Sequence, residues 1–164
     1  MLKKNARPTV IGIISDTHGL LRPEAVAALR GSDMILHAGD VGSQDILDGL
    51  RQIAPLTVVR GNVDRADWVR EQKLAETELI EIGKISIYML HDLEQLDLKP
   101  KAAGISAVVY GHSHMPREEV KDGVLYFNPG SAGPRRFKLP VSVGKLVVEG
   151  SMIRHEVIEL AVGA

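Results

Sequence analysis

Short apolar segments alternate with polar, glycine-containing turns through the first half of the chain. Residues 9–14 form a run rich in β-branched side chains, and residues 33–38 and 56–60 are similar runs that end near a glycine. Such runs, bounded by polar residues, are typical of buried strands. The pattern therefore predicts one strand in each of these segments.

Two helices are predicted between these strands. The first covers residues 23–29, with Pro23 at its entry and Gly31 beyond its end. The second follows Ser43, a candidate N-cap, and runs through about Ile53 with apolar residues on one face. This strand and helix order predicts parallel pairing by right-handed crossovers, which places the carboxyl ends of the strands at one edge of a sheet.

The second half of the chain is dominated by predicted β-hairpins. Each consists of two apolar or alternating runs that meet at a glycine-containing turn. The predicted strand pairs are 79–82 with 85–90, 119–121 with 124–127, and 141–149 with 152–160, and a further short strand covers residues 108–110. The chain thus combines an α/β half with a half made of hairpins.

A length of 164 residues accommodates one ordinary domain, so we expect a single domain over residues 1–164. The content of 45% hydrophobic and 25% charged residues is that of a globular protein. Two β-sheets packed face to face, with helices outside, reconcile the two halves within one α/β domain.

Charge and composition remove several function classes. The net charge is −1 and aromatic residues make up only 4%, so we expect no general nucleic-acid binding and no attachment to acidic membranes. The chain contains no cysteine, which excludes disulfides and thiol nucleophiles and restricts any metal to oxygen and nitrogen ligands. In the absence of a long apolar run, the predicted location is the cytoplasm.

Asp16 and His18 follow the first predicted strand in the series Asp16-Thr17-His18-Gly19. In an extended backbone, residues i and i+2 point to the same side, so this carboxylate and imidazole are expected to converge on one ion. The alternative is a loop aspartate beside an incidental histidine.

Further polar residues follow the other predicted strands. Asp40 and Asn62 each come directly after a glycine and could also be ordinary turn residues. His91 could be a half-buried strand terminus, and His112 and His114 could be solvated loop residues. Together, however, these side chains form an oxygen and nitrogen ligand set large enough for two divalent cations.

The ordered series resembles the calcineurin-like metallophosphoesterases, and within them the small bacterial and archaeal phosphodiesterases. The resemblance rests on the motifs Asp16-x-His18, Gly39-Asp40, Gly61-Asn62, His91 and Gly111-His112-x-His114. It implies a four-layer α/β/β/α sandwich of two mixed β-sheets flanked by helices. It also implies a phosphodiesterase that acts on a small phosphate ester, while the oligomeric state stays open.

The resemblance also assigns roles to these residues. Asp16, His18 and His114 are expected to hold one metal, and Asn62, His91 and His112 the second. Asp40 is expected to bridge the two ions, and Asp40, Asn62 and His91 are the predicted catalytic residues. The ions would be Mn²⁺ in the first instance, with Fe, Ni²⁺, Zn²⁺ or Mg²⁺ as alternatives. A hydroxide between two such ions would attack phosphorus in line.

One position departs from the wider family. Many relatives carry a histidine after the Gly-Asn pair, which is thought to protonate the leaving group or hold the phosphate, whereas this chain has Val63. Valine can do neither. Catalysis is therefore expected to favour leaving groups that depart unaided. The small phosphodiesterase branch shares this gap, which thus points to that branch and does not exclude catalysis.

The remaining candidates have weaker chemical interpretations. His37 is expected to be a packed residue or a support for the ligands. The segment 128–131 is either a motif of this branch or a structural turn, and Arg135 and Arg136 either pair with a substrate phosphate or are solvated. His155 has no predicted chemical role.

Two other functions compete with hydrolysis. A scaffold could retain the fold and lose the chemistry, as the retromer subunit that resembles this family has done. A protein that binds a single metal would leave Asn62, His91 and His112 without a purpose. Because a competent residue occupies every ligand position, we favour the hydrolase.

Overall fold

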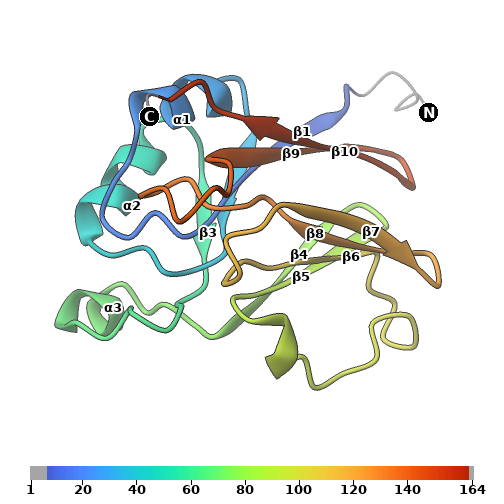
Figure 1. The fold of residues 1–164 in the computed structure, drawn as a ribbon. Helices are drawn as coiled ribbons and strands as arrows, with labels where there is room; N and C mark the ends of the chain where they lie inside the picture. Colours follow the sequence, from blue (N-terminus) through green and yellow to red (C-terminus); the bar gives the residue numbers. More distant parts are fainter. Residues whose placement is uncertain (1–6, 163–164) are drawn as a thin grey trace.

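Two five-stranded mixed β-sheets pack face to face in the computed structural model, which describes residues 7–162 (Figure 1). The first sheet has the order β10-β9-β1-β2-β3 and the second has the order β4-β5-β6-β8-β7. This arrangement confirms the predicted α/β sandwich.

The first sheet contains the three strands predicted for the first half of the chain. They are β1 (Thr9–Ile14), β2 (Met34–His37) and β3 (Leu56–Val58), and they pair in parallel. The C-terminal hairpin of β9 (Ser142–Glu149) and β10 (Met152–Glu159) completes this sheet, because β9 pairs antiparallel with β1. The carboxyl ends of β1, β2 and β3 therefore share one edge, as the crossover argument predicts.

The second sheet contains the middle hairpins. Its strands are β4 (Thr77–Ile82), β5 (Ile85–Leu90), β6 (Ala107–Val109), β7 (Arg117–Lys121) and β8 (Val124–Asn128). Strand β6 pairs in parallel with both β5 and β8. The carboxyl ends of β5 and β6, where His91 and the 112–114 loop begin, consequently lie side by side.

Helices cover the outer face of the first sheet. Helix α1 (Pro23–Leu29) has the predicted bounds, whereas α2 (Gln44–Arg51) ends two residues earlier than predicted. Its last turn tightens, with the amide of Ile53 bonding to the carbonyl of Leu50, and Pro55 disfavours helical backbone at the preceding residue. Helix α3 (Asp67–Glu71) was not predicted.

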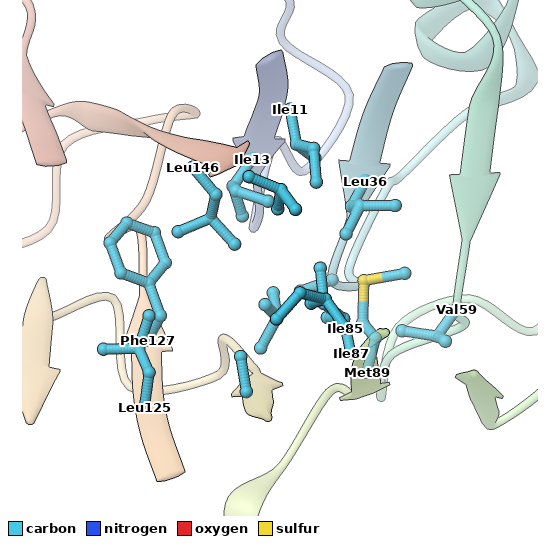
Figure 2. Packing of buried hydrophobic residues seen from close by; sticks show 14 residues of the cluster. Ile11, Ile13, Leu36, Val59, Ile85, Ile87, Met89, Leu125, Phe127 and Leu146 are labelled. Atoms are coloured by element: carbon cyan, nitrogen blue, oxygen red, sulfur yellow. The ribbon is translucent and has the colours of Figure 1, made fainter. Parts of the chain in front are cut away.

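The main hydrophobic core lies between the two sheets (Figure 2). Side chains of the first sheet, such as Ile11, Ile13 and Leu146, face Ile87 and Phe127 of the second. Burying each such side chain contributes about 1.5–3 kcal/mol. The core fixes the two sheets against each other and thereby positions the loops at their shared edge.

Two smaller clusters form the outer layers. One packs α1 and α2 on the first sheet through residues such as Leu29, Leu47 and Leu50. The other covers the second sheet with a short 3₁₀ helix, η2 (Leu93–Gln95), and the loop after it. The fourth layer of the sandwich is therefore thin, with η2 in the place of a longer helix.

Candidate metal centre

Five of the predicted ligands meet at the edge where the two sheets join. The Nε2 atom of His114 lies 3.4 Å from Oδ1 of Asp16, and those of His18 and His91 lie 3.8 and 3.9 Å from the same oxygen. Asp40 lies within the same cluster, 3.3 Å from His91. Two groups of potential ligands result, Asp16 with His18 and His114, and Asp16 with Asp40 and His91.

The Asp16 carboxylate is held so that one oxygen faces the imidazoles. Its Oδ2 accepts hydrogen bonds from the Ser15 hydroxyl at 2.8 Å and from the backbone amide of His112 at 3.1 Å. Its Oδ1 is buried and has no hydrogen-bond partner among the described residues. Burial raises the pKa of Asp16, which reflects the cost of a charge that lacks its full complement of partners.

Asp40 lies between two histidines of different predicted ligand sets. Its Oδ2 is 3.6 Å from Nε2 of His18 and 3.3 Å from Nε2 of His91, while its Oδ1 accepts a hydrogen bond from the Val63 amide at 3.0 Å. Burial opposes ionisation of Asp40, but the nearby His91 ring and the hydrogen bond from the Val63 amide outweigh it and lower the pKa to about 2. Asp40 is therefore a carboxylate at neutral pH.

The orientation of His91 is fixed by its other ring nitrogen. The Nδ1 atom lies 2.7 Å from the carbonyl oxygen of Ala38, which can only accept, so Nδ1 carries a proton and Nε2 faces Asp40. Burial disfavours protonation of this ring, but Asp40 and Asp16 outweigh burial and raise the pKa of His91. A cation at this position would take the place of the second ring proton.

The local backbone of the ligand loops differs from the extended geometry assumed for Asp16-x-His18. Asp16 and His18 have φ values of 56° and 46°, and Asp40, His112 and His114 have values of 56°, 73° and 64°. All five therefore adopt left-handed backbone, which the side chains of Asp and His tolerate better than most. Asp16 and His18 do converge, but a coiled loop brings them together. The expectation of extended backbone was wrong.

Two glycines allow the loops to approach each other closely. A Cβ atom at Gly61 would collide with Oδ1 and the backbone of Asp40, and one at Gly111 would collide with the Ser15 hydroxyl and lie 2.8 Å from Oδ2 of Asp16. A larger residue at position 61 would thus separate the loops after β3 and β2, and one at position 111 would separate the loop after β6 of the second sheet from the loop after β1 of the first. The glycine before a polar residue in this sequence serves close packing as well as turning.

Two predicted ligands lie at the margin of the cluster. The side chain of His112 is 46% exposed, and its Nε2 is 3.9 Å from Oδ2 of Asp92, while its ring meets that of His91 edge-on at 5.2 Å. Asn62 is exposed and stands between Gly61 and Val63, both of which contact Asp40. The structure therefore brings Asn62 and His112 beside the cluster without packing them into it.

Asp64 has a structural role that the sequence did not reveal. Its buried carboxylate accepts hydrogen bonds from the backbone amides of Val41, Gly42 and Gly61, at distances between 2.8 and 3.1 Å. These amides belong to the two loops that carry Asp40 and Asn62. Asp64 thereby joins the two loops. Its only sequence signal is its place two residues after Asn62.

His37 supports the cluster and is buried beneath it, in agreement with the prediction. The amide of Gly39 donates to its Nδ1 at 3.1 Å, so Nε2 carries the proton and donates to the Thr17 hydroxyl at 3.0 Å. That hydroxyl donates in turn to the carbonyl of Val41 at 2.7 Å. Burial lowers the pKa of His37 to about 3, so the ring stays neutral.

Asn128 has a structural role, as in the second of the two interpretations given for the segment 128–131, a structural turn. Its amide nitrogen donates to the Gly111 carbonyl at 3.0 Å and to the Ser113 hydroxyl at 3.2 Å, and its oxygen accepts from the Gly130 amide at 2.9 Å. It thus fixes the loop that carries His112 and His114. Arg135 and Arg136 are exposed on the following loop.

The donor set fits divalent cations. The Nε2 atoms of His18 and His91 lie 3.8 and 3.9 Å from Oδ1 of Asp16, and all three atoms are buried and lack hydrogen-bond partners among residues 7–162. Unpartnered buried polar atoms cost about 1–3 kcal/mol each, and three that lie this close together indicate a ligand site. Nδ1 of His114 is also buried and unpartnered, whereas the His114 nitrogen that lies 3.4 Å from Asp16 is Nε2. Carboxylate oxygen with imidazole nitrogen suits Mn²⁺, Fe²⁺, Ni²⁺ and Zn²⁺.

Comparisons with known proteins agree with this chemistry. Residues 10–151 match the sequence profile described as "Calcineurin-like phosphoesterase superfamily domain". A probable metallophosphoesterase of Methanothermobacter thermautotrophicus is 37% identical over 158 residues, which cover 91% of each chain. A phosphodiesterase of Methanocaldococcus jannaschii is 27% identical and covers 91% of this chain and 99% of its own.

The fold also matches solved structures. Vacuolar protein sorting 29 of Cryptosporidium parvum superposes with a TM-score of 0.76 at 19% identity, over 94% of this chain and 98% of its own. At this identity the likeness concerns the fold alone. Among the described residues, every helix is too short or too polar to cross a membrane.

Proposed function

The chain belongs to the calcineurin-like phosphoesterase superfamily, and from this membership we propose that it is a metal-dependent phosphodiesterase with two divalent cations at its centre. The observation that carries the proposal is the position of Asp40. One of its oxygens lies within 3.6 Å of His18 and 3.3 Å of His91, which belong to the two predicted ligand sets. A carboxylate so placed can bridge two ions.

The proposed ligands divide into two sets. Asp16, His18 and His114 would hold one cation. Asn62, His91 and His112 would hold the other, and Asp40 would be shared. Asp16 and Asp40 form a second potential group with His91, which supports a pair of neighbouring sites over one isolated site.

Two such cations would lower the pKa of a water held between them and neutralise the charge of the phosphate oxygens. The residues of the chain prepare the site for this chemistry. Ala38 fixes the ring of His91, the Val63 amide fixes Asp40, and the Ser15 hydroxyl and His112 amide fix Asp16. These bonds reduce the rearrangement needed on binding.

The proposed preferences, for diesters and for leaving groups that need no proton, rest on one observation each. A relative that is 27% identical is named a phosphodiesterase. In addition, the side chain at position 63 is an exposed valine, with a relative exposure of 52%, which has no proton to give to a leaving alcohol. We therefore propose preferred substrates with leaving groups that depart without a proton from this position.

A scaffold with the same fold is the second candidate, because the structure resembles vacuolar protein sorting 29. The unpartnered buried atoms of Asp16, His18 and His91 argue for the enzyme. A scaffold that binds no metal would gain nothing from keeping these atoms desolvated. The two candidates differ in metal-dependent turnover.

The test is hydrolysis of a panel of chromogenic phosphodiesters and phosphomonoesters. The protein is first treated with a chelator and then supplied with Mn²⁺, Ni²⁺, Zn²⁺ or Mg²⁺. The proposal expects turnover that disappears with the chelator, returns with metal and is faster for diesters than for monoesters. Absence of turnover with every metal would favour the scaffold.

A further inference from the structure

A groove of about 1060 Å³ adjoins the proposed metal centre. It is lined by Asn62 and His91 of the proposed centre, by residues of the segment that contains α3, and by residues of the segment 92–97 around η2. Its size is slightly above the roughly 300–1,000 Å³ typical of ligand pockets. The groove extends the site in one direction, away from the metal cluster.

Most charged groups that line the groove already have partners. Arg60 pairs with Glu76 at 2.9 Å, and Arg70 pairs with Asp67 at 2.7 Å. The Asp64 carboxylate already accepts hydrogen bonds from three backbone amides. These groups are part of the walls and are less available to a ligand.

Arg65 and Asp97 are different. Within residues 7–162, neither has an oppositely charged group within the 4.0 Å of an ion pair. The Nε atom of Arg65 donates to the backbone carbonyl of Asn62 at 3.0 Å, which anchors the guanidinium beside a predicted ligand and leaves its terminal nitrogens free. Asp97 lies on the η2 side of the groove.

The surface of the groove between these charges is mixed in character. Tyr88 and Leu90 contribute an aromatic ring and an apolar side chain, and Gln95 offers both a donor and an acceptor. A phosphate oxygen suits the fork of Arg65, whereas Asp97 suits a group with N–H or O–H donors. A flat face that bears such donors could lie against Tyr88.

Building on the proposed phosphodiesterase function, we infer that the groove binds the second alcohol of the diester, and that this alcohol is a nucleoside. Arg65 would bind a non-bridging oxygen of the scissile phosphate, which also carries the nucleoside. Asp97 would accept hydrogen bonds from the nucleoside at the far end. Arg65 and Asp97 are thus binding residues that set specificity for the substrate.

Two chromogenic diesters isolate the contribution of the nucleoside. The p-nitrophenyl ester of thymidine 5′-phosphate and methyl p-nitrophenyl phosphate release the same leaving group and differ only in the second alcohol. The metal-loaded wild-type protein is expected to show kcat/KM at least roughly 10-fold higher for the thymidine ester, the effect of one hydrogen bond to a charged group.

Variants assign this preference to particular residues. Asp97→Ala is expected to lower kcat/KM for the thymidine ester by about 10-fold and to leave the ratio between the esters near one. Arg65→Ala is expected to lower kcat/KM for both esters about 10-fold, with partial rescue by Arg65→Lys. The matched controls Asp48→Ala and Arg154→Ala, on α2 and β10, should leave the ratio unchanged.

Calorimetric titration of thymidine 5′-phosphate into the metal-loaded protein gives a readout independent of turnover. Weaker binding by Asp97→Ala than by the wild-type protein supports the nucleoside site even if neither ester is hydrolysed, an outcome that would contradict the proposed function alone. Equal kcat/KM for the two esters, or an ester ratio unaffected by Asp97→Ala, would overturn the nucleoside site and leave the phosphodiesterase function standing.

Discussion

The carboxylate of Asp16 accepts a hydrogen bond of 3.1 Å from the backbone amide of His112, which is 96 residues away in the sequence. Asp16 follows β1 of the first sheet and His112 follows β6 of the second. This hydrogen bond therefore joins a loop of the first sheet directly to a loop of the second. The candidate metal site is therefore largely formed by the fold, and metal binding is expected to require little rearrangement.

Replacement of Asp40 by asparagine tests the proposed bridge. The variant keeps an oxygen that can accept from the Val63 amide, so we expect the fold to be retained. It loses the charge shared by two cations, and hydrolysis should fall by at least about 100-fold, since metal-ion catalysis contributes several kcal/mol. Circular dichroism and diester kinetics measure the two effects. Asp122→Asn, in the β7–β8 turn, is the control, and full activity of Asp40→Asn would refute the bridge.

Asp64→Ala tests the connection between the loops of Asp40 and Asn62. The substitution leaves three buried or half-buried amides without their acceptor, those of Val41, Gly42 and Gly61. We expect the free energy of unfolding to fall by about 2–4 kcal/mol.

Urea denaturation of the metal-free protein measures the change at Asp64. Asp48→Ala, an exposed aspartate on α2, should change the free energy of unfolding by less than about 0.5 kcal/mol. Equal stability of Asp64→Ala and Asp48→Ala would show that the Asp64 bonds contribute nothing to the fold.

Much of the fold could be predicted because its signals are local. Each of the strands β1, β2 and β3 is a run of apolar residues closed by a polar turn, and the turns at Gly83, Gly123 and Gly150 mark the hairpins. Helix α3 was missed because five residues with three charges carry little apolar periodicity. The pairing of β9 with β1 is a contact between distant segments, which local patterns do not encode.

The candidate site shows the same division. The sequence predicts Asp16, Asp40 and His91 at the ends of strands, and therefore at one edge of the sheets. The three residues do meet at that edge. The left-handed backbone of the ligand loops was missed, because Asp and His tolerate this conformation without requiring it. The role of Asp64 was also missed, because its partners are backbone amides, which leave no trace in the pattern of side chains.

The stability of the metal-free protein should depend on the protonation of His37. Its pKa is lowered to about 3 in the folded state, below the ordinary value of 6.5, so between these values the unfolded state binds more protons. The contribution is full above about pH 6.5 and is lost as the pH falls toward 3. From pH 7 to pH 5 this group alone should lower the free energy of unfolding by roughly 2 kcal/mol.

The variant His37→Gln isolates this effect, because it keeps a donor and an acceptor but does not titrate. Urea denaturation at pH 5, 6 and 7 in the presence of a chelator should show a weaker pH dependence for His37→Gln than for the wild-type protein. All other titrating groups, including Asp16 and His91, are common to both proteins. The difference between the two pH dependences of the free energy of unfolding therefore reports on His37. Identical pH dependence would mean that His37 does not remain neutral in the fold.

The most direct test of the central claim is the metal content of the protein together with its hydrolytic activity. Protein is equilibrated with Mn²⁺ and freed of excess metal, and its metal content is measured by elemental mass spectrometry. The same sample is assayed with a phosphodiester. We expect close to two ions per chain and turnover that a chelator abolishes. A protein without bound metal, or one whose turnover is insensitive to the chelator, would contradict a metal centre at Asp16, Asp40 and His91.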